Sequence, residues 1–97
     1  MAEVTLVWTR PAIKDLCDAY DYIHEERPSA ARSVIERLEK SLQALSRHPY
    51  LGRPGRVAGT REHVIPGTPF IIPYWVQHET IELLALIHTS RRWPDSL

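Results

Sequence analysis

Hydrophobic positions alternate at the start of the chain and then take up a helical spacing. Val4, Leu6 and Trp8 alternate along the chain, which predicts a β-strand over residues 3–8. Thr9 follows as the expected N-cap of a helix. The proline two positions later fits the first helical turn, where a missing backbone N–H does no harm. The N-terminus is therefore expected to run from a strand directly into a helix.

Two amphipathic helices are predicted next, over about residues 10–26 and 28–46. The apolar stripe of the first helix consists of Ile13, Leu16, Tyr20 and Ile23. Cys17 borders this stripe and is expected to be buried beside it. The apolar stripe of the second helix consists of Ala31, Val34, Ile35, Leu38, Leu42 and Leu45. Pro28 separates the two helices by a very short turn, so we expect an antiparallel hairpin.

The second half changes to short strand-forming runs between prolines and glycines. Residues 49–60 carry two prolines and three glycines, which predicts a loop on a defined path. Strands are expected over residues 61–65, 70–76 and 81–87. Pro73 favours a sheet edge or a bulge at its position. The last run is almost continuously apolar, which fits a central strand covered on both faces or a buried helix segment, and its neighbours favour the strand.

The order of these elements, β-α-α-β-β-β, predicts an α+β fold. A helical hairpin packs on a small, mainly antiparallel sheet, so that each layer buries its apolar side against the other. A chain of 97 residues is long enough for one hydrophobic core and no more. We therefore expect a single domain over residues 1–97.

The composition is that of an ordinary soluble domain, with 43% hydrophobic and 25% charged residues. No apolar run approaches the ~20 residues that span a bilayer, and the N-terminus lacks the pattern of a secretory signal, so we expect no membrane contact. The single cysteine excludes an internal disulfide and a zinc site of several cysteines. These features predict a protein of the reducing cytoplasm.

Charge is balanced overall, with 12 basic and 12 acidic residues, but it is not balanced along the chain. Four arginines and no acidic residue fall within residues 47–61; they are Arg47, Arg53, Arg56 and Arg61. A cluster of this kind on a neutral protein favours a specific polar or anionic contact over bulk polyelectrolyte binding. The alternative is a solvated arginine-rich loop without a partner.

No motif for a known catalytic centre occurs in the sequence. It lacks a nucleophile elbow, a phosphate-binding P-loop, a dinucleotide fingerprint and a zinc-protease helix. None of the five histidines lies three or four positions from another, so no helix presents a pair of metal ligands. We therefore expect neither a metal nor a cofactor.

The polar residues of the second half could still form a metal-free ribonuclease site. Such a site needs a base for the 2′-hydroxyl proton, cations for the phosphorane charge and an acid for the leaving oxygen. His88 or Glu62 could be the base, with Arg61 and Arg91 as phosphate clamps. Alternatively, His88 ends a strand with a hydrogen bond to the backbone, and the arginines pair with acidic side chains or with a partner protein.

Short runs of residues spread over the whole chain carry a family resemblance. In the second half these are Leu51-Gly52-Arg53-Pro54-Gly55-Arg56, Gly59-Thr60-Arg61-Glu62, Pro69-Phe70-Ile71-Ile72-Pro73-Tyr74, Ile87-His88 and Trp93-Pro94. In the first half they are Trp8-Thr9, Ala12, Asp15-Leu16, Tyr22-Ile23, Pro28 and Ala30-Ala31. Together they resemble the RelE/ParE superfamily of bacterial type II toxins.

The resemblance implies a small cytoplasmic toxin that a cognate antitoxin neutralises. RelE-like members cut mRNA on the ribosome, whereas ParE-like members poison DNA gyrase. The ribonuclease pattern places basic residues on the two strands after Arg61, where this chain has Ile65, Gly67 and Ile71. Because transition-state charge needs several fixed donors, we favour a ParE-like gyrase poison without catalytic residues. A ribosome-dependent ribonuclease and an inactive interaction module are the alternatives.

The resemblance also implies which residues meet each partner. The target is expected to contact Arg53, Arg56, Arg61, Arg91, Arg92 and Trp93. If the chain is a ribonuclease that acts on ribosome-bound mRNA, the active site is expected at Arg61, Glu62, His88 and Arg91. A ParD-like antitoxin is expected on the exposed sheet edge and on the acidic edge of the first helix, at Lys14, Asp18, Asp21 and Glu25. DNA is expected to be reached only through the antitoxin.

Overall fold

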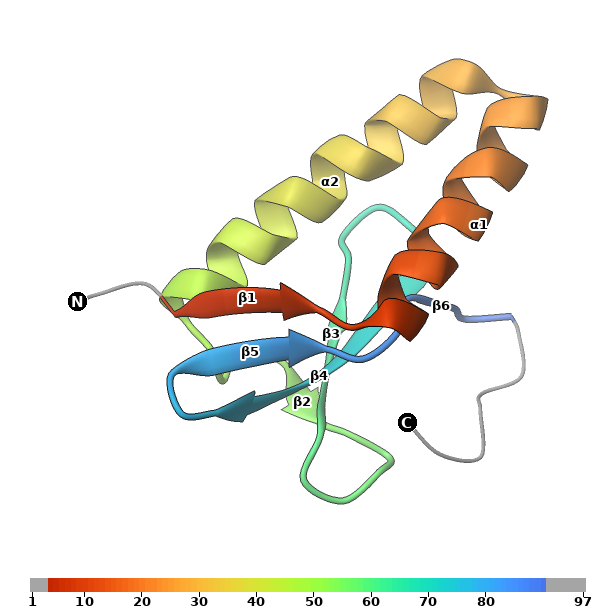
Figure 1. The fold of residues 1–97 in the computed structure, drawn as a ribbon. Helices are drawn as coiled ribbons and strands as arrows, with labels where there is room; N and C mark the ends of the chain where they lie inside the picture. Colours follow the sequence, from red (N-terminus) through yellow and green to blue (C-terminus); the bar gives the residue numbers. More distant parts are fainter. Residues whose placement is uncertain (1–3, 91–97) are drawn as a thin grey trace.

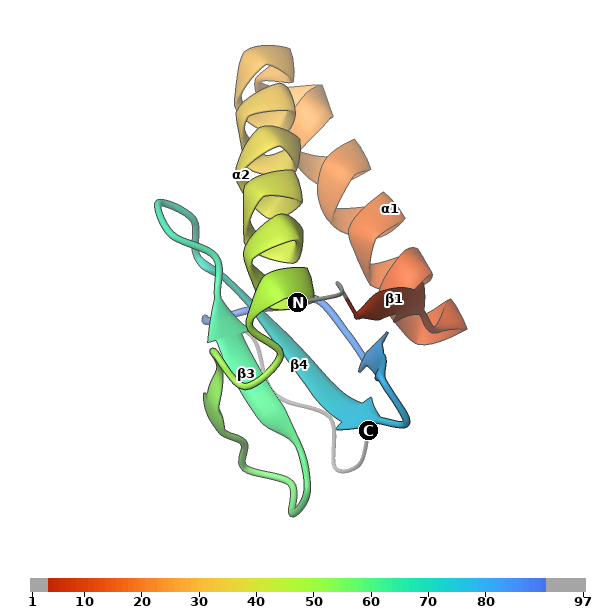
Figure 2. The same ribbon diagram turned by 90° about the vertical axis from the view of Figure 1, so that its left-hand side faces the viewer.

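A computed structural model describes residues 4–90 and contains two helices on one face of a six-stranded sheet (Figures 1 and 2). The elements are β1 (Thr5–Trp8), α1 (Arg10–Glu26), α2 (Pro28–Arg47), β2 (Arg53–Pro54), β3 (Arg61–Val64), β4 (Phe70–Gln77), β5 (Thr80–Leu83) and β6 (Ile87–His88). The predicted α+β class, the helical hairpin and both helix ranges are confirmed, to within one residue. The structure also contains two short strands, β2 and β6, which were not predicted as separate elements.

The sheet is mixed, with the order β1-β5-β4-β3-β2 and with β6 beside β4. Only the β1–β5 pair is parallel among the described strands, so the prediction of a mainly antiparallel sheet is confirmed. The apolar run 81–87 does take a central position, since β5 lies between β1 and β4. It is not one strand, however, because the ladder breaks after Leu83 and resumes at Ile87 as β6.

The break in this run explains how Pro73 fits inside the sheet, where a sheet edge or a bulge was expected. Pro73 is on β4, which pairs with β3 on one side and with β5 and β6 on the other. Its carbonyl accepts the N–H of Leu84 at 2.9 Å. In an antiparallel strand the N and the carbonyl of one residue face the same neighbour, so the missing N–H faces the gap where β5 has ended.

The start of α1 is anchored to the centre of the sheet. The Thr9 hydroxyl donates to the carbonyl of Leu83 at 2.7 Å and accepts the N–H of Ala12 at 3.4 Å. Thr9 is therefore the predicted N-cap, with a second hydrogen bond to the end of β5. One turn further on, the Asp15 carboxylate accepts the N–H of Leu86 at 3.0 Å, so α1 also holds the break between β5 and β6.

The buried face of α1 differs from the predicted stripe. The residues that pack on the core are Ala12, Leu16, Ala19 and Ile23. Ile13 and Tyr20 are 47% and 38% exposed, and the predicted burial of Cys17 is wrong because its side chain is exposed. Alanine carries little hydrophobic weight in a sequence pattern, yet its small side chain lets the helix approach the sheet closely.

The predicted stripe of α2 is confirmed. Leu38 and Leu45 are 3% and 0% exposed, and Val34, Ile35 and Leu42 pack against the same core, while Ala31 is 1% exposed. The connection to α1 is a single extended residue, Arg27, which forces the two helices into the antiparallel hairpin seen in Figure 1. Neither helix within residues 4–90 is long and apolar enough to cross a membrane.

Candidate functional site

The arginine loop comprises residues 49–62. It contains the residues of the predicted target contact that the structure describes, Arg53, Arg56 and Arg61. It leaves α2, crosses the edge of the sheet and enters β3. Two of its residues form β2, which pairs Arg53 with Glu62 and Pro54 with Arg61. Residues 49–60 were expected to form a loop throughout, and the short strand at Arg53 and Pro54 corrects that expectation. The pairing fixes where the loop arginines lie relative to the sheet.

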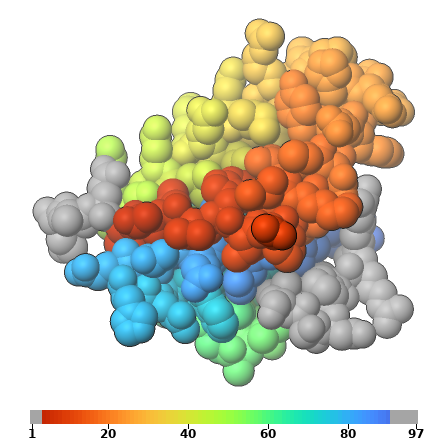
Figure 3. All heavy atoms as spheres, in the orientation of Figure 1, coloured from red at the N-terminus to blue at the C-terminus, as the bar shows by residue number. Residues whose placement is uncertain are grey.

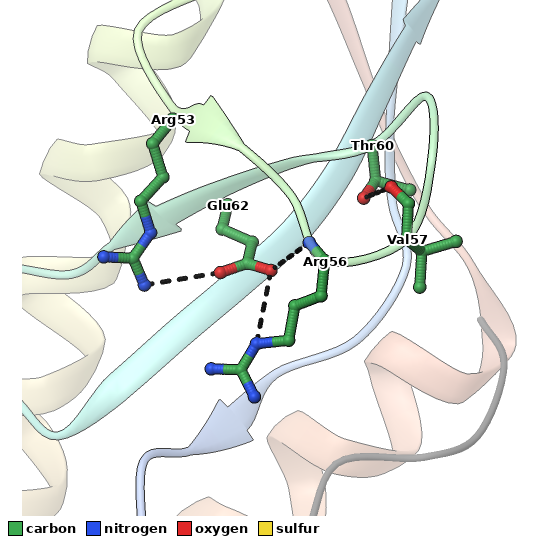
Figure 4. A network of polar contacts seen from close by, with 5 residues as sticks. All are labelled: Arg53, Arg56, Val57, Thr60 and Glu62. Carbon is green, nitrogen blue, oxygen red and sulfur yellow. Dashed lines mark hydrogen bonds and ion pairs between the residues drawn. The ribbon is translucent and has the colours of Figure 1, made fainter.

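A buried carboxylate organises the exposed arginines of the arginine loop (Figure 4). The Glu62 side chain is 3% exposed and accepts the backbone N–H of Arg56 at 2.9 Å. It also meets the Arg53 guanidinium at 3.3 Å and the Arg56 Nε at 3.6 Å. A buried carboxylate is costly unless it is paired and hydrogen-bonded. Glu62 meets that condition with two guanidinium groups that are themselves 57% and 53% exposed.

At two positions of the arginine loop, neighbouring atoms lie so close to the backbone that only glycine fits. A Cβ on Gly52 would lie 2.7 Å from the Tyr74 hydroxyl and 2.8 Å from the carbonyl of Glu62. A Cβ on Gly55 would clash with the Thr60 hydroxyl, because the Gly55 N–H donates to the Thr60 carbonyl at 2.8 Å. The glycine, threonine and glutamate positions of this segment thus build the loop, and Arg53 and Arg56 project from it.

The buried side chain of Tyr74 connects β4 to the first residues of the arginine loop through two hydrogen bonds. The Tyr74 hydroxyl donates to the carbonyl of Pro49 at 2.8 Å and accepts the N–H of Gly52 at 2.8 Å. Burial raises the pKa of this phenol, so it stays protonated and keeps both hydrogen bonds.

Arg61 braces the arginine loop from the side of the sheet that faces the helices. Its guanidinium donates to the carbonyl of Gly52 at 2.7 Å and to that of Tyr50 at 3.3 Å. The guanidinium carbon also lies 5.0 Å from the centre of the Tyr50 ring, within cation–π distance. Arg61 is therefore occupied by the loop, whereas Arg53 and Arg56 extend outward from Glu62.

The described residues of the ribonuclease alternative do not meet. Arg61 is opposite Tyr74 on β4, and Tyr74 faces the helices. Side chains alternate along a strand, so Glu62 faces the other side of the sheet. His88 is opposite Phe70 at the far edge of β4. Phe70 and Tyr74 are four steps apart along β4, which is about 13 Å at ~3.3 Å per residue.

The imidazole of His88 is engaged locally. Its Nδ1 accepts the backbone N–H of Ser90 at 3.1 Å, and the ring meets Phe70 edge-on with centroids 5.4 Å apart. That hydrogen bond matches the expected strand-end histidine bonded to the backbone. With Nδ1 as the acceptor, a neutral ring carries its proton on Nε2. The Ser90 hydroxyl also lies 2.7 Å from Nδ1.

The predicted contacts Arg91, Arg92 and Trp93 lie outside the described residues. Within residues 4–90, no three His, Cys, Asp or Glu side chains come together as metal ligands.

Sequence reasoning gave no role to His63, yet the structure places it in an unusual position. Its Nε2 is buried without a hydrogen-bond partner among the described residues, and burial lowers the pKa of the ring. His63 is opposite Ile72, so it faces the helices beside α2. The alternation of β3 could have predicted this face from the sequence.

A groove of about 720 Å³ runs between α1, α2 and the end of the sheet at β6. Its apolar lining includes Ala19, Ile23, Val34, Phe70, Leu86 and Ile87. Asp15 and Asp18 form an acidic rim. Of the predicted antitoxin contacts only Asp18 lines it; Lys14, Asp21 and Glu25 are on another side of α1. Asp15, Ala19 and Tyr22 follow one another at spacings of four and three residues, and this spacing could have predicted the groove side from the sequence.

The sequence matches the family described as the ParE toxin of the parDE type II toxin–antitoxin system over residues 6–93. It is 36% identical over its full length, and over the full length of the relative, to the toxin-like protein Y4kP of Sinorhizobium fredii. It is 32% identical to toxin RelE2 of Caulobacter vibrioides over 94% of this chain and 99% of that protein.

Solved structures of the same superfamily share the fold. A chromosomal ParDE system of P. aeruginosa aligns with a TM-score of 0.81 at 26% identity, over 91% of this chain and 98% of that one. The RelBE2 toxin–antitoxin complex of Mycobacterium tuberculosis aligns with a TM-score of 0.62 at 29% identity, over 91% and 93% of the chains. The fold, the arginine loop and these relatives together show that the chain belongs to the ParE toxin family of type II toxin–antitoxin systems.

Proposed function

We propose that this toxin acts in the cytoplasm by binding DNA gyrase, and that the arginine loop supplies part of the contact. The observation that carries the proposal is the pair of Arg53 and Arg56, held half-exposed by the buried carboxylate of Glu62. An arginine that is already positioned loses little side-chain entropy on binding and presents a planar fork to carboxylate or phosphate groups. Arg91, Arg92 and Trp93 are proposed to extend this contact.

The alternative is a ribosome-dependent ribonuclease, which the relative named RelE2 keeps in consideration. Charge on a phosphorane must be met by several donors at one point. Arg61 and His88 are opposite residues of β4 that lie about 13 Å apart along the strand, and Glu62 faces away from both. This separation supports binding over catalysis as the mode of action.

The test is inhibition of purified gyrase by the double variant Arg53→Ala/Arg56→Ala. We expect its inhibitory potency to fall at least about tenfold, which corresponds to about 1.4 kcal/mol. Arg32→Ala, an exposed arginine on α2, is the matched control and should inhibit like the unmodified toxin.

Three results would contradict the gyrase proposal. The first is full potency of the double variant in that assay. The second is cleavage of mRNA on programmed ribosomes that His88→Ala abolishes, which would favour the ribonuclease. The third is harmless overexpression without an antitoxin, which would favour an inactive interaction module.

We infer that a ParD-like antitoxin docks in the groove between the hairpin and β6. Its apolar floor and acidic rim at Asp15 and Asp18 suit an amphipathic segment with basic side chains, which would fold on binding. Hydrogen exchange on the free and complexed toxin tests this inference. Protection should appear at residues 15–23 and 86–90, and unchanged exchange there would contradict it.

A further inference from the structure

Helix α1 has a second apolar stripe that does not face the core. Ile13, Cys17, Tyr20 and His24 follow one another at spacings of four, three and four residues, so they form one line along the helix. All four are exposed, and the rings of Tyr20 and His24 stack with centroids 5.5 Å apart. Figure 3 shows α1 at the outer surface of the molecule. The groove proposed for the antitoxin is on the other side of α1, at Asp15 and Tyr22.

A row of exposed charges runs beside this stripe, one position further along the chain. Its members are Arg10, Lys14, Asp18, Asp21 and Glu25. The first two are basic and the last three are acidic, so the row changes sign near its middle. Lys14 and Asp18 meet at the change of sign, at 2.8 Å.

The order of charge in this row opposes the dipole of its own helix. Helix N-termini favour acidic side chains and C-termini favour basic ones. The first turn of α1 holds Arg10 and no acidic residue, and the last turn holds Glu25. The row is therefore not arranged to suit the dipole of its own helix, although Lys14 and Asp18 pair within it.

From these features we infer that α1 pairs with α1 of a second copy of this chain, antiparallel about a two-fold axis. This symmetry places the same flank of both helices side by side with opposite direction. Arg10 and Lys14 of one copy then face the acidic residues of the other, and the two apolar stripes bury each other. A parallel two-fold would place the two rows on opposite sides of the helix pair, where their charges would not meet. The pairing is a separate inference from the antitoxin groove, and of the α1 residues named for the pairing only Asp18 also lines that groove.

The first measurement is the oligomeric state of the toxin without its antitoxin, on protein made by cell-free synthesis. Light scattering after size exclusion should give the mass of a dimer at micromolar concentration. Ile13→Glu should give a monomer with unchanged helix content and Tm. Leu51→Glu, at an apolar position that is 50% exposed outside α1, is the control and should stay dimeric.

Charge exchange tests the self-complementary row directly. Arg10→Glu/Lys14→Glu makes the row entirely acidic, and Asp18→Lys/Asp21→Lys/Glu25→Lys makes it entirely basic. Each variant alone should be monomeric at low salt, and an equal mixture should form a heterodimer. These substitutions suit the helix dipole but remove the Lys14–Asp18 ion pair and place like charges four residues apart. Each variant alone must therefore keep the helix content of the unmodified toxin before loss of the dimer is ascribed to the interface.

Four results would overturn the inference. The unmodified toxin could be monomeric throughout. The charge variants could each dimerise like the unmodified toxin. A short bismaleimide could fail to couple Cys17 to Cys17 in a dimer, which would place the interface elsewhere. Finally, Cys17 could become protected from alkylation only when the antitoxin binds, which would assign the stripe to that partner.

Discussion

At the scale of single residues, the family motif around the arginine loop separates into scaffold and contact positions. Gly52 and Gly55 allow close approach, and Glu62 binds the loop to β3. Arg53 and Arg56 are fixed by these neighbours and remain about half exposed. Substitution at a scaffold residue should therefore affect stability as well as target binding.

Glu62→Gln is predicted to destabilise the fold by about 1–3 kcal/mol, because a neutral amide replaces a buried charged acceptor of three interactions. Urea unfolding measures the change. Glu39→Gln, an exposed glutamate on α2, should change the free energy of unfolding by less than about 0.5 kcal/mol. Equal effects of the two substitutions would contradict the role assigned to Glu62.

His63 predicts a dependence of stability on pH. Burial lowers its pKa in the folded state, so the unfolded chain, with a pKa near 6.5, binds the proton more tightly. The contribution of His63 is complete above pH ~6.5 and is lost as the pH falls from there towards the folded pKa. His63→Gln should flatten the fall in unfolding free energy between pH 7.5 and 5.5. His78→Asn, in an exposed turn, should leave its slope unchanged.

At the scale of elements, the sequence predicted those whose signals are local. Both helices end where the proline and capping signals indicated, and the α2 stripe is the one observed. The break in the run 81–87 was missed because its cause is remote: Asp15, 71 positions earlier, binds the N–H of Leu86. The buried face of α1 was missed because alanines form much of it. The loop arginines were named, but their pairing with Glu62 depends on the β2–β3 register.

Thr9→Ala is predicted to lower the free energy of unfolding by about 1–2 kcal/mol, since it removes both the helix cap and the hydrogen bond to Leu83. The loss should be accompanied by faster amide exchange in the first turn of α1. Thr5→Ala, an exposed threonine on β1, is the control. A Thr9→Ala protein as stable as the Thr5→Ala protein would show that the cap does not anchor α1.

At the scale of the whole molecule, the fold separates three surfaces. The arginine loop extends from the β3 edge, the groove proposed for the antitoxin is between the hairpin and β6, and the second stripe of α1 faces outward. Because different elements form the loop and the groove, the antitoxin groove does not include the arginines proposed to bind gyrase. We therefore expect the antitoxin to neutralise the toxin without covering these arginines, because its bulk or the shape of the complex keeps gyrase away from them.

The central claim is that gyrase is the target, and pulse labelling tests it most directly. Thymidine and amino-acid incorporation are followed side by side in bacteria, within minutes of inducing the toxin without its antitoxin. We predict that DNA synthesis falls first, with double-strand breaks, and that Arg53→Ala/Arg56→Ala weakens this effect. If protein synthesis falls first while DNA synthesis continues, the target is the translation machinery and the account is contradicted.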